Sequence, residues 1–236
     1  VELPKVIFGH PWLLSGKEKM SKSTGNVMYA DDLVNLFGVD AIRYYVLSET
    51  PYSNDGTITY ELIIDKVNSE LVNTLGNLVN RTIGMAKKYF DSKVTYHDFD
   101  DKDNNELISK INDLDSLIEK KFEHYEAGAA IGLIIDLLKS SNKFIDIKEP
   151  WVLAKDEKKK EELETVLYIL LEAIRVSAIF LEPFIPDAAI NIKDQINSSD
   201  ATFVFNRDNN YELNEAKILF QRIDKEEKLK EINENN

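Results

Sequence analysis

The sequence predicts a mainly α-helical fold, an antiparallel helical bundle preceded by a short α/β segment. Between Tyr60 and Phe180, apolar residues recur at spacings that are mostly three to five, which is the pattern of helices that bury one face. The connections between these helices are mostly short, and short connections favour antiparallel neighbours. A β-like run near the beginning, Val6–Gly9, lies outside this region and indicates the α/β segment.

The first part of the chain, residues 1–58, is expected to combine a strand with two short helices. Asp31 or Asp32 should cap the first helix and Gly38 should end it, because carboxylates favour helix starts and glycine favours helix ends. In order, the expected elements are a strand that begins at 6–9 and leads through 12–14 to a loop at 15–27, helices at 33–37 and 40–47, and a turn from Pro51 to Gly56.

The second part, residues 59–236, is expected to form the bundle. Pro150 should end one of its helices, and Pro183 with Pro186 another, because proline interrupts the helical hydrogen bonds. In order, we expect a long helix over 60–90, a polar connection over 91–105, helices over 107–122, 129–147 and 158–180, a short helix over 187–196, a loop over 197–215 with one strand at 202–205, and a helical tail from 225.

Composition limits the classes of function. No apolar run approaches the roughly 18–20 residues that span a membrane. The absence of cysteine excludes disulfides and thiolate metal sites, and the histidines, His10, His97 and His124, are far apart in sequence, so we expect no metal site. A net charge of −13 argues against broad, nonspecific RNA binding but permits a local basic groove.

The beginning of the chain gives a further expectation. Val1–Pro4 contains no initiator methionine and lacks the basic and apolar regions of a signal peptide. We therefore expect an excised fragment, or a chain whose beginning was removed by processing, with a cytoplasmic location.

The run Lys19, Met20, Ser21, Lys22 and Ser23 is the strongest candidate for chemistry. It puts two ammonium groups and two hydroxyls on one short segment flanked by glycines, which suits a mobile loop that closes over phosphates. When ATP releases pyrophosphate, negative charge grows on the bridging and leaving oxygens, and lysines that meet this charge in the transition state accelerate the reaction. Lys22 is the first candidate and Lys19 assists it.

In its longer frame, this run resembles the end of the nucleotide-binding domain of class I aminoacyl-tRNA synthetases. The frame comprises Gly9-His10, Trp12-Leu13, Gly25-Asn26-Val27 and the stretch from Phe37 to Tyr45. The resemblance implies that Lys19 and Lys22 are catalytic and that the five-residue run binds the phosphates of ATP, accompanied by Mg²⁺ in the whole enzyme. Residues 1–58 would be the end of a Rossmann-like catalytic domain. His10 alone is expected to be structural.

A second group of candidates lies in the helical part. Asn77 and Arg81 are four residues apart and therefore project from one helix face, and Trp151 follows Pro150 between two helices. Unstacked RNA bases are recognised by aromatic side chains that stack on them and by amide and guanidinium groups that read their edges. Singly, each residue would be ordinary, with Trp151 in the core and the other two on a helix surface.

This combination resembles the anticodon-binding domain of methionyl-tRNA synthetases, and the resemblance covers essentially the whole chain. It implies that Asn77, Arg81 and Trp151 contact the anticodon loop, CAU, of tRNA(Met), and that residues 59–236 are the anticodon-binding domain with a C-terminal tail. The whole enzyme attaches methionine to its tRNA with ATP. The family's His-Ile-Gly-His motif and methionine pocket lie upstream of these residues, so we expect this chain alone to be a monomer that forms no methionyl adenylate.

Two alternatives remain open on the sequence alone. Class I synthetases for leucine, isoleucine, valine or cysteine share the lysine–serine run. A stand-alone helical interaction module without RNA binding would fit the acidic charge slightly better.

Overall fold

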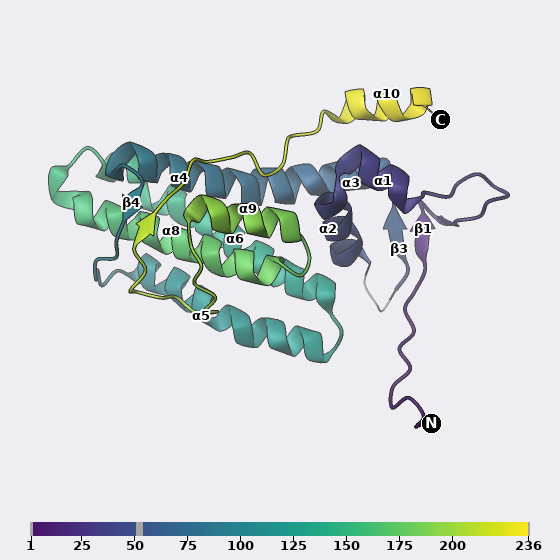
Figure 1. The fold of residues 1–236 in the computed structure, drawn as a ribbon, viewed down its shortest axis with the longest axis horizontal. Coiled ribbons are helices and arrows are strands. Elements are labelled where there is room, and N and C mark those ends of the chain that lie inside the picture. The colour runs from purple at the N-terminus through teal and green to yellow at the C-terminus, as the bar shows by residue number, and fades with distance from the viewer. Residues whose placement is uncertain (1, 51–53, 236) are drawn as a thin grey trace.

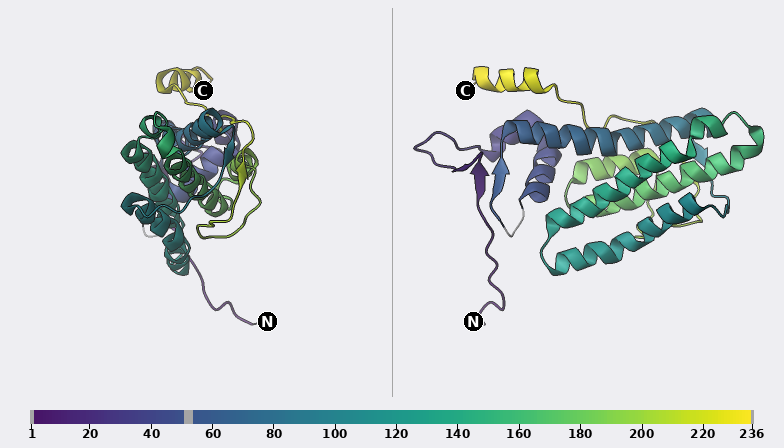
Figure 2. Two further views of the ribbon diagram at one scale, coloured as in Figure 1. Left: turned by 90° about the vertical axis from the view of Figure 1, so that its left-hand side faces the viewer. Right: turned by 180° about the vertical axis from the view of Figure 1, so that it is seen from behind.

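The computed structural model describes residues 2–50 and 54–235, and its long helices run alternately in opposite directions along the longest axis (Figure 1). This arrangement confirms the predicted antiparallel bundle. Figure 2 shows the small sheet at one end of the long helices, with the N-terminal segment leading away from it.

The elements follow the chain in this order. The first part contains β1 (Leu13–Ser15), β2 (Glu18–Lys19), α1 (Ala30–Phe37), α2 (Val39–Glu49) and β3 (Gly56–Ile58). The second part contains α3 (Tyr60–Lys66), the π-helical segment η1 (Val67–Gly76), α4 (Asn77–Phe90), β4 (Lys93–Val94), α5 (Lys102–Glu123), α6 (Ala127–Lys148), α7 (Pro150–Leu153), the 3₁₀ turn η2 (Glu157–Lys159), α8 (Lys160–Leu181), α9 (Pro186–Ile196), β5 (Tyr211–Glu212) and α10 (Lys225–Asn235).

The first strand lies later than its predicted start at residues 6–9. β1 pairs antiparallel with β2 and parallel with β3, with Leu14 opposite both Lys19 and Thr57. Ile7, in contrast, is 88% exposed and has no strand beside it in the described part of the chain. A strand forms where partners complete its hydrogen bonds, so β1 begins at Leu13. The predicted turn at 51–56 includes β3 from Gly56, and its residues 51–53 lie outside the described residues.

The two predicted short helices are present as α1 and α2. Gly38 ends α1 with φ 87°, a left-handed conformation that glycine adopts without steric cost. The predicted carboxylate cap is wrong, because the helix begins one residue after Tyr29 and no side chain caps it. Asp31 and Asp32 lie instead in the first turn, where negative charge is favourable next to the helix dipole.

Polar contacts fasten the first part of the chain to the bundle. The Arg43 side chain of α2 donates to the carbonyl oxygens of Pro183 and Phe184, at 2.6 and 2.8 Å. Asp40 accepts the amide of Ala188 at the start of α9, at 2.7 Å. Burial raises the pKa of Asp40 above its usual value even though the Ala188 amide opposes the shift. The buried carboxylate of Asp40 therefore fixes α2 to the start of α9, and the exposed Arg43 holds it to the chain between α8 and α9.

The predicted long helix over residues 60–90 is continuous but changes its winding. α3 passes into η1, in which hydrogen bonds span one residue more than in an α-helix, and α4 then continues to Phe90. The buried residues of η1, Val67, Leu71 and Leu75, are spaced four apart. One face of the helix therefore stays against the core through the wider turns.

α8 is the central helix of the bundle and contacts α4, α5, α6 and α9. Its middle is buried on all sides, in keeping with the apolar run from Val166 to Leu171. A helix that is apolar all round has to lie inside the protein. The other long helices therefore surround α8, and each contributes one apolar face.

The predicted polar connection over residues 91–105 is too long. α5 begins at Lys102, because the Asp101 carboxylate accepts the amides of Asp103 and Asn104 as an N-cap. Burial alone would raise the pKa of Asp101, but hydrogen bonds from Lys148 and from these two amides outweigh it and hold the pKa below its usual value. Within the former connection, β4 pairs with β5.

The strand predicted at residues 202–205 is wrong. Arg175 of α8 donates to the carbonyl oxygens of Thr202 and Val204, at 2.6 and 2.7 Å. These carbonyls are satisfied by a buried guanidinium and not by a neighbouring strand. The strand of this segment is β5, where Tyr211 lies opposite Val94.

The C-terminal tail is helical from Lys225, as predicted. Asn68 of η1 accepts the amide of Ile223 at 2.9 Å and donates to its carbonyl at 2.8 Å. Lys225 then pairs with Asp65 of α3 at 2.6 Å. These contacts fasten α10 along α3 (Figure 1). Among the described residues, no helix has the length and apolar character needed to cross a membrane.

Candidate functional site

The lysine–serine run forms a compact turn that one asparagine closes. The Asn26 side chain accepts the Ser21 amide at 2.8 Å and the Thr24 hydroxyl at 2.9 Å, and donates to the Lys19 carbonyl at 3.2 Å. The hydroxyls of Ser21 and Ser23 lie 2.7 Å apart. Sequence reasoning included Asn26 in the family frame but assigned it no role. Its contacts give the turn a fixed shape before any ligand binds.

The two lysines of this turn differ in their surroundings. The ammonium group of Lys19 lies 4.9 Å from the ring centroid of Trp12, in cation–π geometry. Lys22 is exposed and, within the described part of the chain, has no ion-pair partner. An exposed ammonium without a carboxylate partner keeps its full charge for an incoming anion. The exposed ammonium group of Lys22 is therefore accessible to an anion, as the predicted phosphate-binding role requires.

Asn77 and Arg81 both project into solvent from the first turns of α4. Asn77 begins α4 directly after η1, and both side chains are exposed, while their neighbours Leu78, Val79 and Thr82 are buried. The two predicted residues thus share an outer face of the bundle, as their spacing indicated. Both side chains are therefore accessible to a polar ligand.

Trp151 lies on a sharp corner between α6 and α7. Glu149 turns the chain with φ 44° and ψ 61°, and Pro150 occupies the first position of α7, where its missing amide costs nothing. Pro150 is buried, whereas the Trp151 side chain is 41% exposed and Val152 is 45% exposed. An indole that is held on a rigid corner and half open to solvent can stack on a planar ring.

One ion pair joins the α4 residues to the helix that leads to Trp151. Arg81 lies 3.7 Å from the carboxylate of Asp146, five residues before Trp151. Both side chains are substantially exposed, so the pair is weak and can exchange for a ligand contact. Sequence reasoning missed Asp146, because nothing in its local pattern distinguishes it from other surface acids.

The two candidate regions lie far apart. In Figure 1 the loop after β1 extends at one end of the longest axis, and the chain between α6 and α8 turns at the other end. A ligand that contacts both regions has to span the length of the molecule. A single small molecule cannot do this, so the regions must contact different parts of a large ligand or separate ligands.

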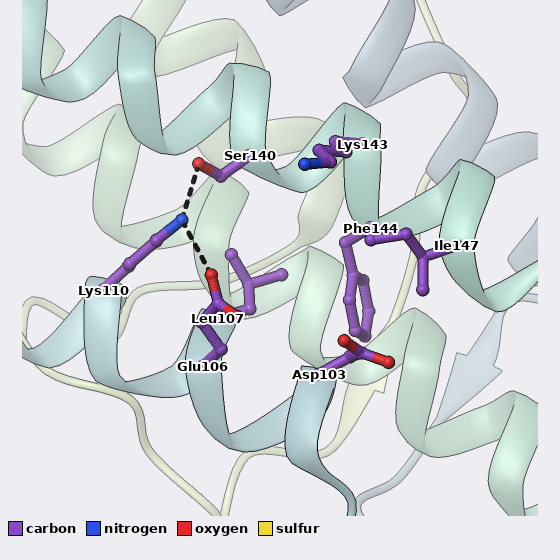
Figure 3. Close-up of a pocket in the computed structure, with 8 residues that line it drawn as sticks. All are labelled: Asp103, Glu106, Leu107, Lys110, Ser140, Lys143, Phe144 and Ile147. Carbon is purple, nitrogen blue, oxygen red and sulfur yellow. Dashed lines mark hydrogen bonds and ion pairs between the residues drawn. The ribbon is translucent and has the colours of Figure 1, made fainter.

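Grooves on α5 do not contain the predicted residues. A cavity of about 230 Å³ lies between α5 and α6. Among its lining residues, Lys110 lies 3.2 Å from Ser140 and 3.3 Å from Glu106 (Figure 3). Its lysines are balanced by Asp103 and Glu106, so it has no net attraction for an anion. A larger groove of about 580 Å³ between α5 and α8 has an aromatic floor, and its residues contact neither candidate region.

Comparison with protein families matches both parts of the chain. Residues 1–83 match the family described as tRNA synthetases class I (M). Residues 97–232 match the family described as the anticodon binding domain of methionyl tRNA ligase. Together the two matches include every candidate residue and leave out residues 84–96 and 233–236.

Curated relatives and solved structures agree with the family matches. The methionine–tRNA ligase of Clostridium acetobutylicum is 42% identical over 237 residues, which is 98% of this chain and 37% of that protein. The Bacillus subtilis enzyme is 37% identical over 96% of this chain and 35% of its own length. The structure of Mycobacterium tuberculosis methionyl-tRNA synthetase in complex with methionyl-adenylate superposes with a TM-score of 0.87 at 30% identity, covering 94% of this chain and 45% of that one.

These comparisons decide between the synthetase alternatives that the lysine–serine run left open. The chain spans little more than a third of the length of the curated relatives that it matches. On a family match over more than half of its residues and on identities near 40%, the chain belongs to the methionyl-tRNA synthetase family of class I aminoacyl-tRNA synthetases.

Proposed function

We propose that this chain supplies two parts of a methionine–tRNA ligase. Residues 59–236 form the anticodon-binding domain, and residues 1–58 form the end of the catalytic domain with its phosphate loop. In the whole enzyme, ATP with Mg²⁺ and methionine would bind to parts that include upstream residues, and methionine would be attached to tRNA(Met) in the cytoplasm.

The arrangement of Asn77, Arg81 and Trp151 carries the RNA-binding part of the proposal. An amide and a guanidinium on α4 and an indole on α7 are exposed, and the Arg81–Asp146 ion pair connects α4 to α6, the helix that leads to the indole. This set offers stacking and edge recognition to unstacked bases without a broadly basic surface. It therefore fits a chain whose net charge is −13.

The turn closed by Asn26 carries the ATP part. Lys22 is exposed without an ion-pair partner among the described residues, and Lys19 is held at the Trp12 ring. We infer that Lys22 meets the charge that develops on the phosphates as pyrophosphate leaves, and that Lys19 assists it. Met20, Ser21 and Ser23 complete the phosphate-binding turn. This turn lies at the opposite end of the molecule from the chain between α6 and α8, so ATP bound there would leave the anticodon surface accessible.

The binding of an RNA stem-loop tests the anticodon proposal. Trp151→Ala should weaken the binding of a stem-loop with anticodon CAU by roughly 5- to 150-fold, because stacking contributes roughly 1–3 kcal/mol per base. Fluorescence anisotropy with labelled RNA measures the affinity. Trp12→Ala is the matched control, since Trp12 is 64% exposed at the other end of the molecule, and this variant should keep wild-type affinity.

Two results would contradict the proposal. Equal affinity of the wild-type chain for CAU and for changed anticodons would show that the chain does not recognise the anticodon sequence. The complete absence of RNA binding would favour the stand-alone helical interaction module.

A further inference from the structure

The segment η1 lies immediately before Asn77 and differs from every long helix around it. It is a π-helix of ten residues, whereas π-helices are rare, are mostly single turns and occur often at functional sites. Each residue added to a turn rotates the following residues by roughly 100° relative to a regular α-helix with 3.6 residues per turn. The direction in which Asn77 and Arg81 face therefore depends on η1.

Local contacts fit the end of η1 to the wider turn. The amide of Asn77 donates to the carbonyl of Val72, five residues earlier. The Thr74 hydroxyl also donates to the carbonyl five residues before it, at 2.9 Å. A side chain at Gly76 would place its Cβ 3.1 Å from the carbonyl oxygen of Leu71. Glycine has no Cβ, so its presence at this position avoids a close contact between a side chain and this carbonyl oxygen.

Asn142 of α6 holds this end of η1 from outside. Its Nδ2 donates to the carbonyl of Thr74 at 3.0 Å and to the carbonyl of Leu138 in its own helix at 3.0 Å. Thr74 lies three residues before Asn77, and α6 continues from Asn142 to the corner that carries Trp151. One half-buried amide therefore connects the π-helical segment to the helix that leads to the indole.

We propose that Asn142 is a positioning residue for RNA recognition. By holding the end of η1 against α6, it sets the direction in which Asn77 and Arg81 face relative to Trp151. It contacts no base itself and acts through these residues. This inference rests on the proposed anticodon recognition and names the residue that fixes the geometry of the recognition site.

The test compares Asn142→Ala with Asn191→Ala in the 236-residue chain. Asn191 of α9 also donates its Nδ2 to a carbonyl four residues earlier, at 2.9 Å to Asp187, and so is a matched control within one helix. The probes are RNA stem-loops with anticodon CAU and with a changed anticodon. Asn142→Ala should bind the CAU loop about fivefold more weakly, the factor that corresponds to about 1 kcal/mol for one net hydrogen bond, and should lose its preference for this loop. Asn191→Ala should keep both.

A double-mutant cycle separates positioning from simple stabilisation. If Asn142 acts through Asn77, the loss caused by Asn142→Ala should be smaller in an Asn77→Ala background, since residues in one network are not additive. A lower melting temperature with an unchanged CAU preference would overturn the inference while leaving the proposed function intact. If the wild-type chain has no CAU preference, the proposed function fails and the inference fails with it.

Discussion

At the scale of single residues, three asparagine side chains form hydrogen bonds with the main chain where main-chain partners are lacking. Asn26 closes the lysine–serine turn, Asn68 binds both the amide and the carbonyl of Ile223, and Asn142 holds Thr74. A carboxamide has a donor and an acceptor in one plane, so it can bind an amide and a carbonyl as a peptide group does. These residues fix irregular backbone that neither a helix nor a sheet would satisfy.

The role of Asn26 gives a prediction about the phosphate loop. Asn26→Ala should speed hydrogen exchange of the Ser21 amide by about tenfold, because the variant lacks the acceptor that protects it. Hydrogen exchange measured by NMR checks this. Asn35→Ala, on the exposed face of α1, should leave the exchange unchanged. Equal exchange rates in all three proteins would mean that Asn26 does not hold the loop.

At the scale of elements, α8 organises both the bundle and the irregular segment that follows α9. Besides pairing with Arg175 at 2.7 Å, Glu172 accepts the Asn206 amide at 2.7 Å and the Asn209 side chain at 2.8 Å. It also accepts the hydroxyl of Tyr211. Burial, followed by the Glu172 charge, raises the pKa of Tyr211 well above its usual value, so this phenol stays protonated as a donor. The segment from 197 to 215 is therefore fastened to α8 by side chains.

Removing the charge of Glu172 should destabilise the protein strongly. Glu172→Gln removes the nearer carboxylate of the buried Arg175 guanidinium and leaves only Asp200, at 3.7 Å, as its counter-charge, and breaking a buried pair costs about 3–5 kcal/mol. Urea denaturation followed by circular dichroism measures the free energy of unfolding. Glu182→Gln is the control, because Glu182 forms an ion pair with Lys193 at the surface, and such pairs contribute about 0–1 kcal/mol. Similar losses in the two variants would contradict this account of α8.

At the scale of the whole molecule, carboxylates on irregular segments make stability depend on pH. Burial alone would raise the pKa of Asp200, but hydrogen bonds from the Asn206 side chain, the Thr202 amide and the Asn209 side chain outweigh it and hold the pKa well below its usual value. The folded protein therefore prefers the ionised form of Asp200. Its contribution to stability is complete above the unfolded pKa of about 3.9 and is lost as the pH falls below it.

A pH series should show this contribution directly. Asp200→Asn should lower the free energy of unfolding at pH 7, by roughly 1–3 kcal/mol for impaired hydrogen bonds to a charged group. The difference from wild type should shrink as the pH falls from about 4 towards 2, because Asp200 of the unfolded wild-type chain then takes up a proton while the folded protein still holds this carboxylate ionised. Urea midpoints at each pH measure the difference. Asp136→Asn, at an exposed site, should follow the wild type, and a constant Asp200→Asn difference would refute the linkage.

The sequence by itself determined the approximate positions of the helices, the acidic charge of the bundle and the candidate functional residues. Helical periodicity and Pro/Gly boundaries are local properties, so α1, α2, α6, α8 and α9 are found near their predicted positions. The lysine–serine run and the trio of Asn77, Arg81 and Trp151 were identified by their spacing along the chain. Their roles stay predictions, supported by exposure and by the Arg81–Asp146 ion pair.

Only the tertiary structure decided how irregular backbone is satisfied. The predicted strand at 202–205 was wrong because Arg175 takes its carbonyls, and β1 was displaced because its partners lie at residues 18–19 and 56–58. In the same way, a carbonyl of η1 accepts a hydrogen bond from Asn142 of another helix. These features come from contacts between residues that are distant in sequence, and such contacts cannot be predicted from a local sequence pattern.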